Sequence, residues 1–101
     1  MSDPSLNLVN AVYADRIEAV RALLKNPSVD PNKYESLHWA VSFGKVEMAK
    51  ILVEHGADVN KRDYNAKGRV IYPLTTAVGC SAPLEVIQVL VSHGAKLDAT
   101  D

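Results

Sequence analysis

Apolar residues recur along the chain at the spacing of an amphipathic helix, and they do so in three similar segments. Residues 46–60 return 38 positions later as residues 84–98, with six identities and mostly like-for-like changes elsewhere. Residues 17–25 match the same register at a shift of 29. An internal repeat of this length is typical of a chain built from stacked units. We therefore predict three copies of one unit, each ending in a helix.

A shorter apolar segment precedes each of these helices. The three segments are residues 8–12, residues 36–43 followed by Gly44, and residues 73–78 followed by Gly79. Gly56 and Gly94 follow the longer helices and are predicted C-caps, because glycine takes the left-handed conformation without steric cost. Pro73 and Pro83 are predicted first-turn residues, where a missing N–H has no partner to lose. Helices this short cannot bury their apolar stripes alone, so the copies must stack.

Two motifs are specific enough to suggest a family. Residues 35–40, Glu-Ser-Leu-His-Trp-Ala, and residues 72–77, Tyr-Pro-Leu-Thr-Thr-Ala, approximate the signature Thr-Pro-Leu-His-x-Ala. The closing motif Gly-Ala-Asp-Val-Asn is intact at residues 56–60 and degraded at residues 94–98. In these motifs the chain resembles the ankyrin repeat.

The resemblance covers about residues 5–98 and implies an all-α solenoid of three stacked helix-turn-helix units. The predicted organisation is one ankyrin-repeat domain over residues 1–101, with repeats at about 5–32, 33–60 and 61–98.

The spacing departs from the family unit of about 33 residues. Leu8 to Leu37 is 29 residues and Leu37 to Leu74 is 37. We expect a short first hairpin at residues 32–35 and a long second hairpin at residues 61–72. The third copy also has one extra residue between its helices, which we place near residues 80–82.

The charge balance excludes several classes of function. Eleven Lys and Arg against twelve Asp and Glu give a net charge of −1, so no overall field draws the chain to nucleic acid or to an anionic membrane. The apolar runs are far shorter than the roughly 20 residues of a membrane span. Cys80 is the single cysteine, and the first residues lack the features of a signal peptide, so we expect an intracellular protein, cytoplasmic or nuclear.

No catalytic or cofactor chemistry is indicated by the motifs. No Cys or His pair has zinc spacing, and no glycine-rich phosphate loop is present, so we expect no metal, no cofactor and no enzyme activity. Cys80 is interpreted as a buried small side chain or an idle thiol. His55 and His93 stand at helix C-termini, where an imidazole complements the dipole. The resemblance implies that His38 ties adjacent hairpins together and that Asn60 bonds within its hairpin, at a position that asparaginyl hydroxylases modify in some eukaryotic repeats.

The resemblance also implies that partners bind at the hairpin tips and the exposed face of the inner helices. All six aromatic residues fall in those regions, although aliphatic outer helices would leave them nowhere else to go. Phe43 is expected to pack between helices, and Thr76 to lie on the exposed face. The predicted partner-binding residues are Tyr13, Tyr34, Trp39, Ser42, Lys61, Arg62, Tyr64, Lys67, Arg69 and Tyr72.

Residues 61–69 carry four basic residues and one acid, which gives this hairpin a charge of +3. Such a loop could bind an acidic or phosphorylated segment of a partner protein, or could be a solvated insertion with no partner. The predicted function is therefore protein–protein interaction through the concave face.

The last predicted helix, residues 84–91, has little polar surface. Exposed apolar surface of this kind needs a cover. The alternative function is structural: the uncapped third repeat packs on another copy of the chain or on further repeats of a longer array. The first copy instead offers polar residues, which are Asn7, Asn10, Asp15 and Arg16.

Overall fold

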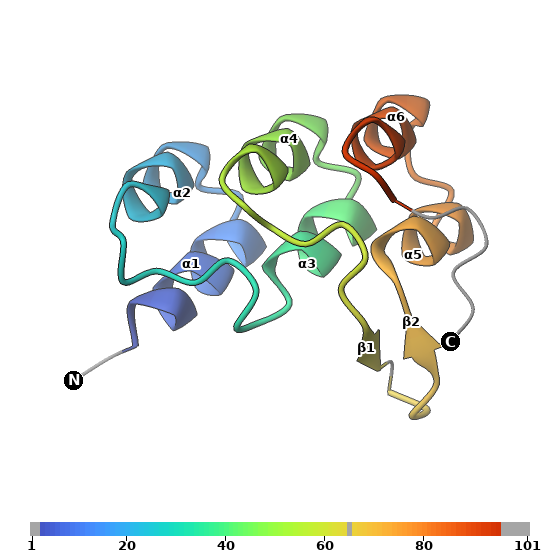
Figure 1. Ribbon diagram of the computed structural model, residues 1–101, viewed down its shortest axis with the longest axis horizontal. Helices are drawn as coiled ribbons and strands as arrows, with labels where there is room; N and C mark the ends of the chain where they lie inside the picture. The colour runs from blue at the N-terminus through green and yellow to red at the C-terminus, as the bar shows by residue number, and fades with distance from the viewer. Residues whose placement is uncertain (1–2, 65, 96–101) are drawn as a thin grey trace.

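The computed structural model describes residues 3–64 and 66–95, which form two rows of helices and one small hairpin (Figure 1). The elements are α1 (Pro4–Tyr13), α2 (Ile17–Leu24), α3 (Ser36–Ser42), α4 (Val46–Glu54), β1 (Asp63–Tyr64), β2 (Val70–Ile71), α5 (Pro73–Gly79) and α6 (Leu84–Ser92). The inner row is α1, α3 and α5, and the outer row is α2, α4 and α6. The expected all-α architecture is confirmed, and α4 and α6 are packed neighbours.

Equivalent aliphatic positions of the three repeats form one continuous core between the rows. Leu52 and Leu90 occupy equivalent positions of two outer helices and are fully buried, and Val20 of the first outer helix is also fully buried. Leu8, Leu37 and Leu74 occupy equivalent positions of the inner helices and belong to the same cluster. Burying each such side chain contributes about 1.5–3 kcal/mol, so the stack, and not any single helix, is stable.

The turn from inner to outer helix is the same in all three repeats. Asp15, Gly44 and Ser81 take positive φ values of 60°, 66° and 54°. After each, the next N–H donates to a carbonyl five residues earlier at 2.9 Å, as from Lys45 to Ala40. This pair of features is the Schellman ending of a helix. The sequence placed Gly79 just after the third inner helix, but Gly79 is the last residue of α5, and Ser81 is the left-handed residue.

The extra residue of the third repeat is Pro83, which follows this turn and adjoins the expected residues 80–82. Pro83 is the N-cap of α6, so it lies just before the helix and not in its first turn. Pro73 is in the first turn of α5, as predicted. A side chain on Gly44 would place its Cβ 3.0 Å from Cδ of Pro83. Glycine is therefore favoured at position 44 for two reasons: it adopts a positive φ without strain, and it leaves room for Pro83 of the next repeat.

The outer helices α4 and α6 end as predicted. Gly56 and Gly94 have φ of 98° and 94°. The preceding histidines, His55 and His93, hold Nδ1 2.9 Å and 2.8 Å from the carbonyl oxygen four residues earlier. The imidazoles therefore contact the last turn, in keeping with the role expected for them at helix C-termini.

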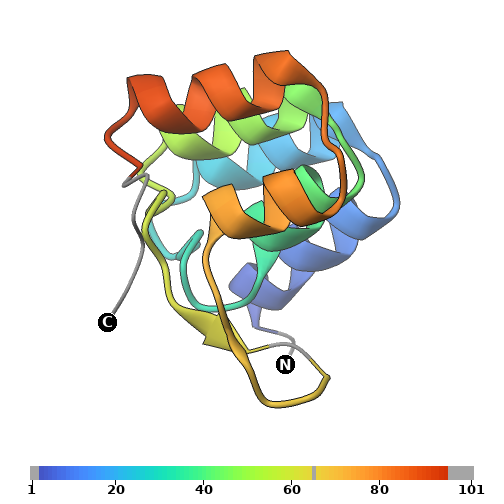
Figure 2. The same cartoon turned by 90° about the vertical axis from the view of Figure 1, so that its right-hand side faces the viewer.

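The two connections between repeats differ in the way that the spacing predicted. Residues 25–35 contain no strand, whereas the second connection forms an antiparallel pair in which Asp63 lies opposite Ile71. This hairpin projects below the inner helices (Figure 2). The degraded closing motif of the third repeat extends past residue 95, and its residues 96–98 lie outside the described part of the chain.

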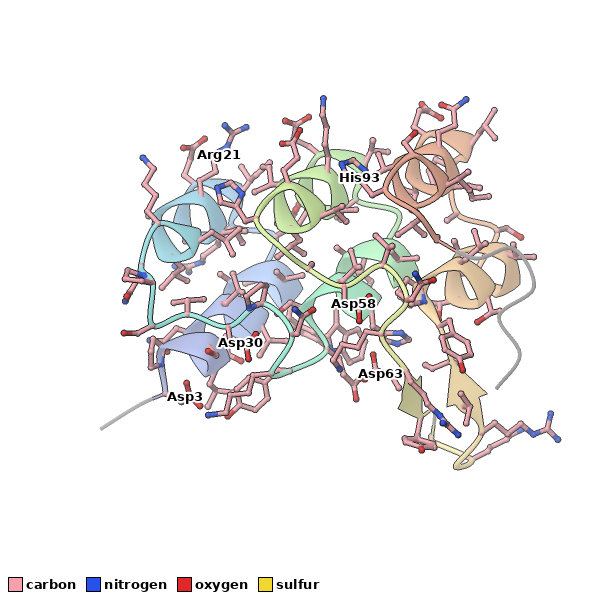
Figure 3. All side chains as sticks on the ribbon, viewed as in Figure 1. Asp3, Arg21, Asp30, Asp58, Asp63 and His93 are labelled. Atoms are coloured by element: carbon pink, nitrogen blue, oxygen red, sulfur yellow. The ribbon has the colours of Figure 1, made fainter. Side chains whose placement is uncertain are left out.

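Asparagine side chains join each connection to the next one. Asn32 donates from Nδ2 to the carbonyl of Gly56 at 3.1 Å and accepts at Oδ1 from the N–H of Asp58 at 2.7 Å. Asn60 repeats the first contact, with Nδ2 3.1 Å from the Gly94 carbonyl. The residues that begin these turns, Asp30 and Asp58, follow one another along the loop side of the molecule (Figure 3). The predicted structural role of Asn60 thus takes the form of a bond between successive repeats.

We expect Asn32→Ala to destabilise the domain by about 1–2 kcal/mol, because two backbone groups lose their partner. Asn32→Asp should also destabilise it, since a carboxylate keeps the bond to the Asp58 N–H but faces the Gly56 carbonyl without a proton to donate. Urea unfolding followed by circular dichroism measures both losses. Asn7→Ala, on an exposed helix surface, is the control. Equal stability of Asn32→Ala and Asn7→Ala would contradict the bridging role.

Candidate functional site

Three aromatic rings of the inner row contact one another, from Tyr13 in α1, Trp39 in α3 and Phe43 at the C-cap of α3. The Tyr13 ring of α1 lies edge-on to the Trp39 ring of α3, with centroids 5.4 Å apart, and edge-on to the Phe43 ring at 5.6 Å. Trp39 and Phe43 are tilted together at 5.5 Å. Edge-to-face contacts at these distances are favourable and hold the rings in place. We call Tyr13, Trp39 and Phe43 the aromatic cluster.

The aromatic cluster is largely open to solvent. Tyr13 is 63% exposed and Phe43 is 43% exposed, while Trp39 is half-buried. The expectation that Phe43 packs between helices is therefore wrong: its ring lies beside Tyr13 at the surface. The sequence placed Phe43, like all six aromatic residues, in the regions where partners bind, and its signal was its place at the end of an inner helix, like Tyr13.

A hollow of about 360 Å³ adjoins the cluster at Trp39. Its walls come from the inner helices through Val9 and Trp39, and from the two connections through Tyr34 and Lys61, among others. The ammonium of Lys61 forms an ion pair with Asp63, which also lines the hollow. Trp39 is common to the hollow and the cluster, so the two form one continuous surface.

Lys33 and Tyr34 have an intramolecular partner in Asp3. The Asp3 carboxylate caps α1 by accepting from the Ser5 N–H at 2.9 Å, and it also accepts from the Tyr34 hydroxyl at 3.1 Å. Lys33 forms an ion pair with the same carboxylate, and its Nζ lies 5.9 Å from the centroid of the Tyr34 ring. Tyr34 is thus held against the first helix at one edge of the hollow.

These contacts shift three pKa values. The Lys33 hydrogen bond and the Ser5 N–H lower the pKa of Asp3 below 3.8. The hydrogen bond to Asp3 raises the pKa of Lys33 above 10.5. The same carboxylate, accepting from the hydroxyl, raises the pKa of Tyr34 above 10.0.

Two polar contacts link α3 to α5 beside this surface. The Thr76 hydroxyl lies 3.4 Å from Nδ1 of His38, and Thr76 is buried, so its predicted place on the exposed face is wrong. His38 joins neighbouring inner helices through this contact. Ser42 Oγ lies 3.7 Å from Sγ of Cys80, whose side chain is exposed. Of the two interpretations of Cys80, the buried side chain is therefore wrong, and the idle thiol stays a prediction.

The remaining predicted residues lie on or beside the β1–β2 hairpin. Tyr64 on β1 is 57% exposed, and Tyr72 is the N-cap of α5, where its N–H donates to Thr75 Oγ1 at 2.9 Å. The exposed basic residues of this hairpin are Arg62, Lys67 and Arg69. Asp63, labelled in Figure 3, marks where the hairpin leaves the helices. The structure thus brings Tyr13, Trp39 and the hollow together and leaves the hairpin tip apart from them.

Within residues 3–64 and 66–95, no group of three or more His, Cys, Asp and Glu side chains could hold a metal ion. Over the same residues, no helix combines the length and apolar character that a membrane span requires.

Comparison with known proteins finds ankyrin repeats over residues 5–91, and the chain belongs to that family. The family described as "Ankyrin repeats (3 copies)" matches residues 5–63, and "Ankyrin repeats (many copies)" matches residues 37–91. An ankyrin repeat-containing protein of Schizosaccharomyces pombe is 45% identical over 40 residues, which are 40% of this chain and 19% of that protein. The human protein phosphatase 1 regulatory subunit 27 is 35% identical over 74 residues, which are 73% of this chain and 45% of that protein. The chain spans less than half the length of either relative.

The Asp3 contacts predict a stability that depends on pH at both ends of the scale. A lowered pKa at Asp3 means that its stabilisation is present above pH 3.8 and is lost as the pH falls through the lower folded value. The pKa values of Tyr34 and Lys33 are raised instead. The stabilisation from Tyr34 is therefore present below pH 10.0, and that from Lys33 below pH 10.5. Each is lost as the pH rises through the higher pKa of the folded state.

Asp3→Asn tests the acidic limb, because the amide can still cap α1 but cannot pair with Lys33. We expect a thermal midpoint a few degrees below that of the wild type at neutral pH, with the difference shrinking well below pH 3.8. Glu54→Gln, at an exposed carboxylate, is the control and should change little. A difference that stays constant across this range would contradict the assignment to the Asp3 charge.

Proposed function

Because the chain belongs to the ankyrin-repeat family, whose domains bind other proteins and are typically not enzymes, we propose where this domain binds and what it binds. The partner is a protein segment that lies across the concave face, from the aromatic cluster over Trp39 to the hollow and the β1–β2 hairpin. The single observation that carries this proposal is the exposed contact among Tyr13, Trp39 and Phe43.

The aromatic cluster has the properties of a binding hot spot. Trp and Tyr rings lose little conformational entropy on binding and bury a large area, and they dominate many interfaces. Here the ring contacts already fix the side chains, so a partner would meet an ordered surface. The aliphatic core is complete without Phe43 and Tyr13, which are therefore available to a partner.

The charge of the second hairpin supports an acidic or phosphorylated segment as the partner. Residues 61–69 have a charge of +3 in a chain whose net charge is −1. A segment anchored by an apolar residue on the cluster would extend over the hollow toward this hairpin. Carboxylates or phosphates there would meet charge of opposite sign, which steers association and fixes orientation.

We place the domain inside the cell as part of the same proposal. The exposed thiol of Cys80 supports this, since a free surface cysteine is typical of a reducing compartment.

A second candidate function is structural, with the third repeat packing on another copy or on further repeats. The specific observation in its favour is the exposure of Val78 and Leu84, at 66% and 64%. It uses a different face, so it is compatible with partner binding at the cluster.

Trp39 is the single tryptophan, so its fluorescence reports directly on the proposed site. Peptides selected from a random displayed library on the wild-type domain should carry an apolar anchor with nearby acidic residues, and should change Trp39 emission on titration. Tyr13→Ala should weaken the selected peptides by about tenfold or more. It should cost the fold only about 1 kcal/mol for each lost aromatic contact.

Three controls make the result specific. Val91→Ala, an exposed apolar residue on α6, should leave peptide affinity unchanged. Lysine in place of the acidic residues of a selected peptide should abolish binding, and phosphoserine in their place should retain it. Peptides that bind Tyr13→Ala as tightly as the wild type, or that show no preference for acidic residues, would show that the surface or the partner class is misassigned.

A further inference from the structure

The hollow beside Trp39 contains two lysines, and each is already paired with a carboxylate. Lys33 of the first connection pairs with Asp3, and Lys61 of the second connection pairs with Asp63. Asp3 and Asp63 lie apart along the loop side of the molecule (Figure 3), so these are two separate ion pairs. A ligand anion would therefore have to compete with a carboxylate of the chain for either ammonium group.

Glu35 is the other charged residue on the wall of the hollow, and its side chain is partly buried. Within residues 3–64 and 66–95, its carboxylate takes part in no ion pair. Glu35 is the N-cap of α3, but its side chain makes no capping hydrogen bond. In the described part of the chain, the two lysines thus face the carboxylates of Asp3, Asp63 and Glu35, which leaves one negative charge unbalanced around the hollow.

An aromatic ring lies beside this carboxylate. Trp39 follows Glu35 by four residues, about one helical turn, so both side chains are on the same side of α3, and both line the hollow. The contacts of the Trp39 ring with Tyr13 and His38, at centroid distances of 5.4 Å and 5.5 Å, fix its orientation. The hollow therefore presents an ordered aromatic surface next to a negative charge, and both attract a cation.

Three kinds of occupant can be compared on this wall. An anion would be repelled by Glu35 and would have to displace Asp3, whose carboxylate also holds Tyr34 and Ser5. An apolar side chain would cover the Glu35 carboxylate without giving it a partner, which costs free energy. A cation would balance the charge of Glu35 and leave both existing ion pairs intact. Charge complementarity thus selects a basic side chain.

Arginine suits this site better than lysine. Its planar guanidinium can stack on an aromatic ring and donate two parallel hydrogen bonds to one carboxylate, whereas the lysine ammonium is a compact, strongly hydrated charge. The volume of about 360 Å³ is near the lower end of the range for ligand pockets, roughly 300–1,000 Å³, so one side chain is a suitable occupant.

We infer that the hollow binds an arginine side chain of the partner segment, against the Trp39 ring and the Glu35 carboxylate. The inference rests on the proposed function and deepens it, because it names a residue that the segment contributes. The segment would place an apolar residue on the aromatic cluster, an arginine in the hollow, and acidic residues or phosphates on the β1–β2 hairpin. Glu35 would thus help to determine which segments bind.

The test uses N-acetyl-arginine methylamide as the probe and the indole N–H resonance of Trp39, the single tryptophan, as the readout on the whole chain. We expect a saturable shift of this resonance by nuclear magnetic resonance. The citrulline counterpart, which has the same shape and no charge, should bind about fivefold more weakly or less. Glu35→Gln should weaken binding of the arginine probe by about fivefold. Glu54→Gln, at an exposed glutamate outside the hollow, makes the same chemical change and should leave binding unaltered.

Each other outcome overturns the inference. The absence of a saturable shift, equal binding of the arginine and citrulline probes, or unchanged binding by a Glu35→Gln chain that circular dichroism shows to be folded would each do so. Tighter binding of N-acetyl-glutamate methylamide would show that the lysines of the hollow prevail. Selected peptides that depend on Tyr13 but contain no arginine would overturn this inference and leave the proposed function standing. Peptides that ignore Tyr13→Ala, beside an arginine probe that depends on Glu35, would show the reverse.

Discussion

Mutual coverage of neighbouring helix pairs is the constraint on which the rest of the molecule depends. Each helix is at most ten residues long and has a single apolar stripe, so it gains its stability from the pair beside it. Fully buried residues such as Leu52 lie where three repeats can contribute to one environment. The same constraint leaves one side of the inner helices exposed to solvent, because their apolar side chains are buried against the outer row and against neighbouring repeats. A rigid surface for binding is therefore a product of the packing and requires no separate structure.

Most of the fold could be predicted from the chain because each repeated feature has a local cause. The C-caps at Gly56 and Gly94 follow from glycine's freedom at positive φ, and the long second hairpin follows from the spacing of Leu37 and Leu74. The end of the third inner helix could not be predicted from the local sequence. The sequence placed Gly79 just after this helix, but the Schellman bonds place the left-handed residue at Ser81, which is an uncommon choice for this conformation. Only the packed turn determines that the extra residue is Pro83.

The surface was harder to predict than the core, because its contacts join residues distant in the sequence. Phe43 meets Tyr13 from another repeat at the surface, and no pattern within one repeat gives the rotation between two inner helices. Thr76 is buried, and the residue that its hydroxyl meets, His38, also comes from the neighbouring inner helix. Tyr34 was predicted to bind a partner, and its hydroxyl turns toward Asp3, 31 residues earlier. In each case the type of residue could be read from the sequence, but the direction of its side chain depended on a contact with another repeat and could not be predicted.

The hydrogen bond from the Asp58 amide to Asn32 also makes that amide proton a reporter of contact between the first two repeats. That proton is held by a side chain of the preceding connection, at 2.7 Å between donor and acceptor, and not by its own helix. Its exchange with deuterated solvent would quicken whenever the first two repeats separate, even while both keep their helices. A single backbone proton would thus distinguish parting of the repeats from melting within them, and would measure how cooperative so short a solenoid is.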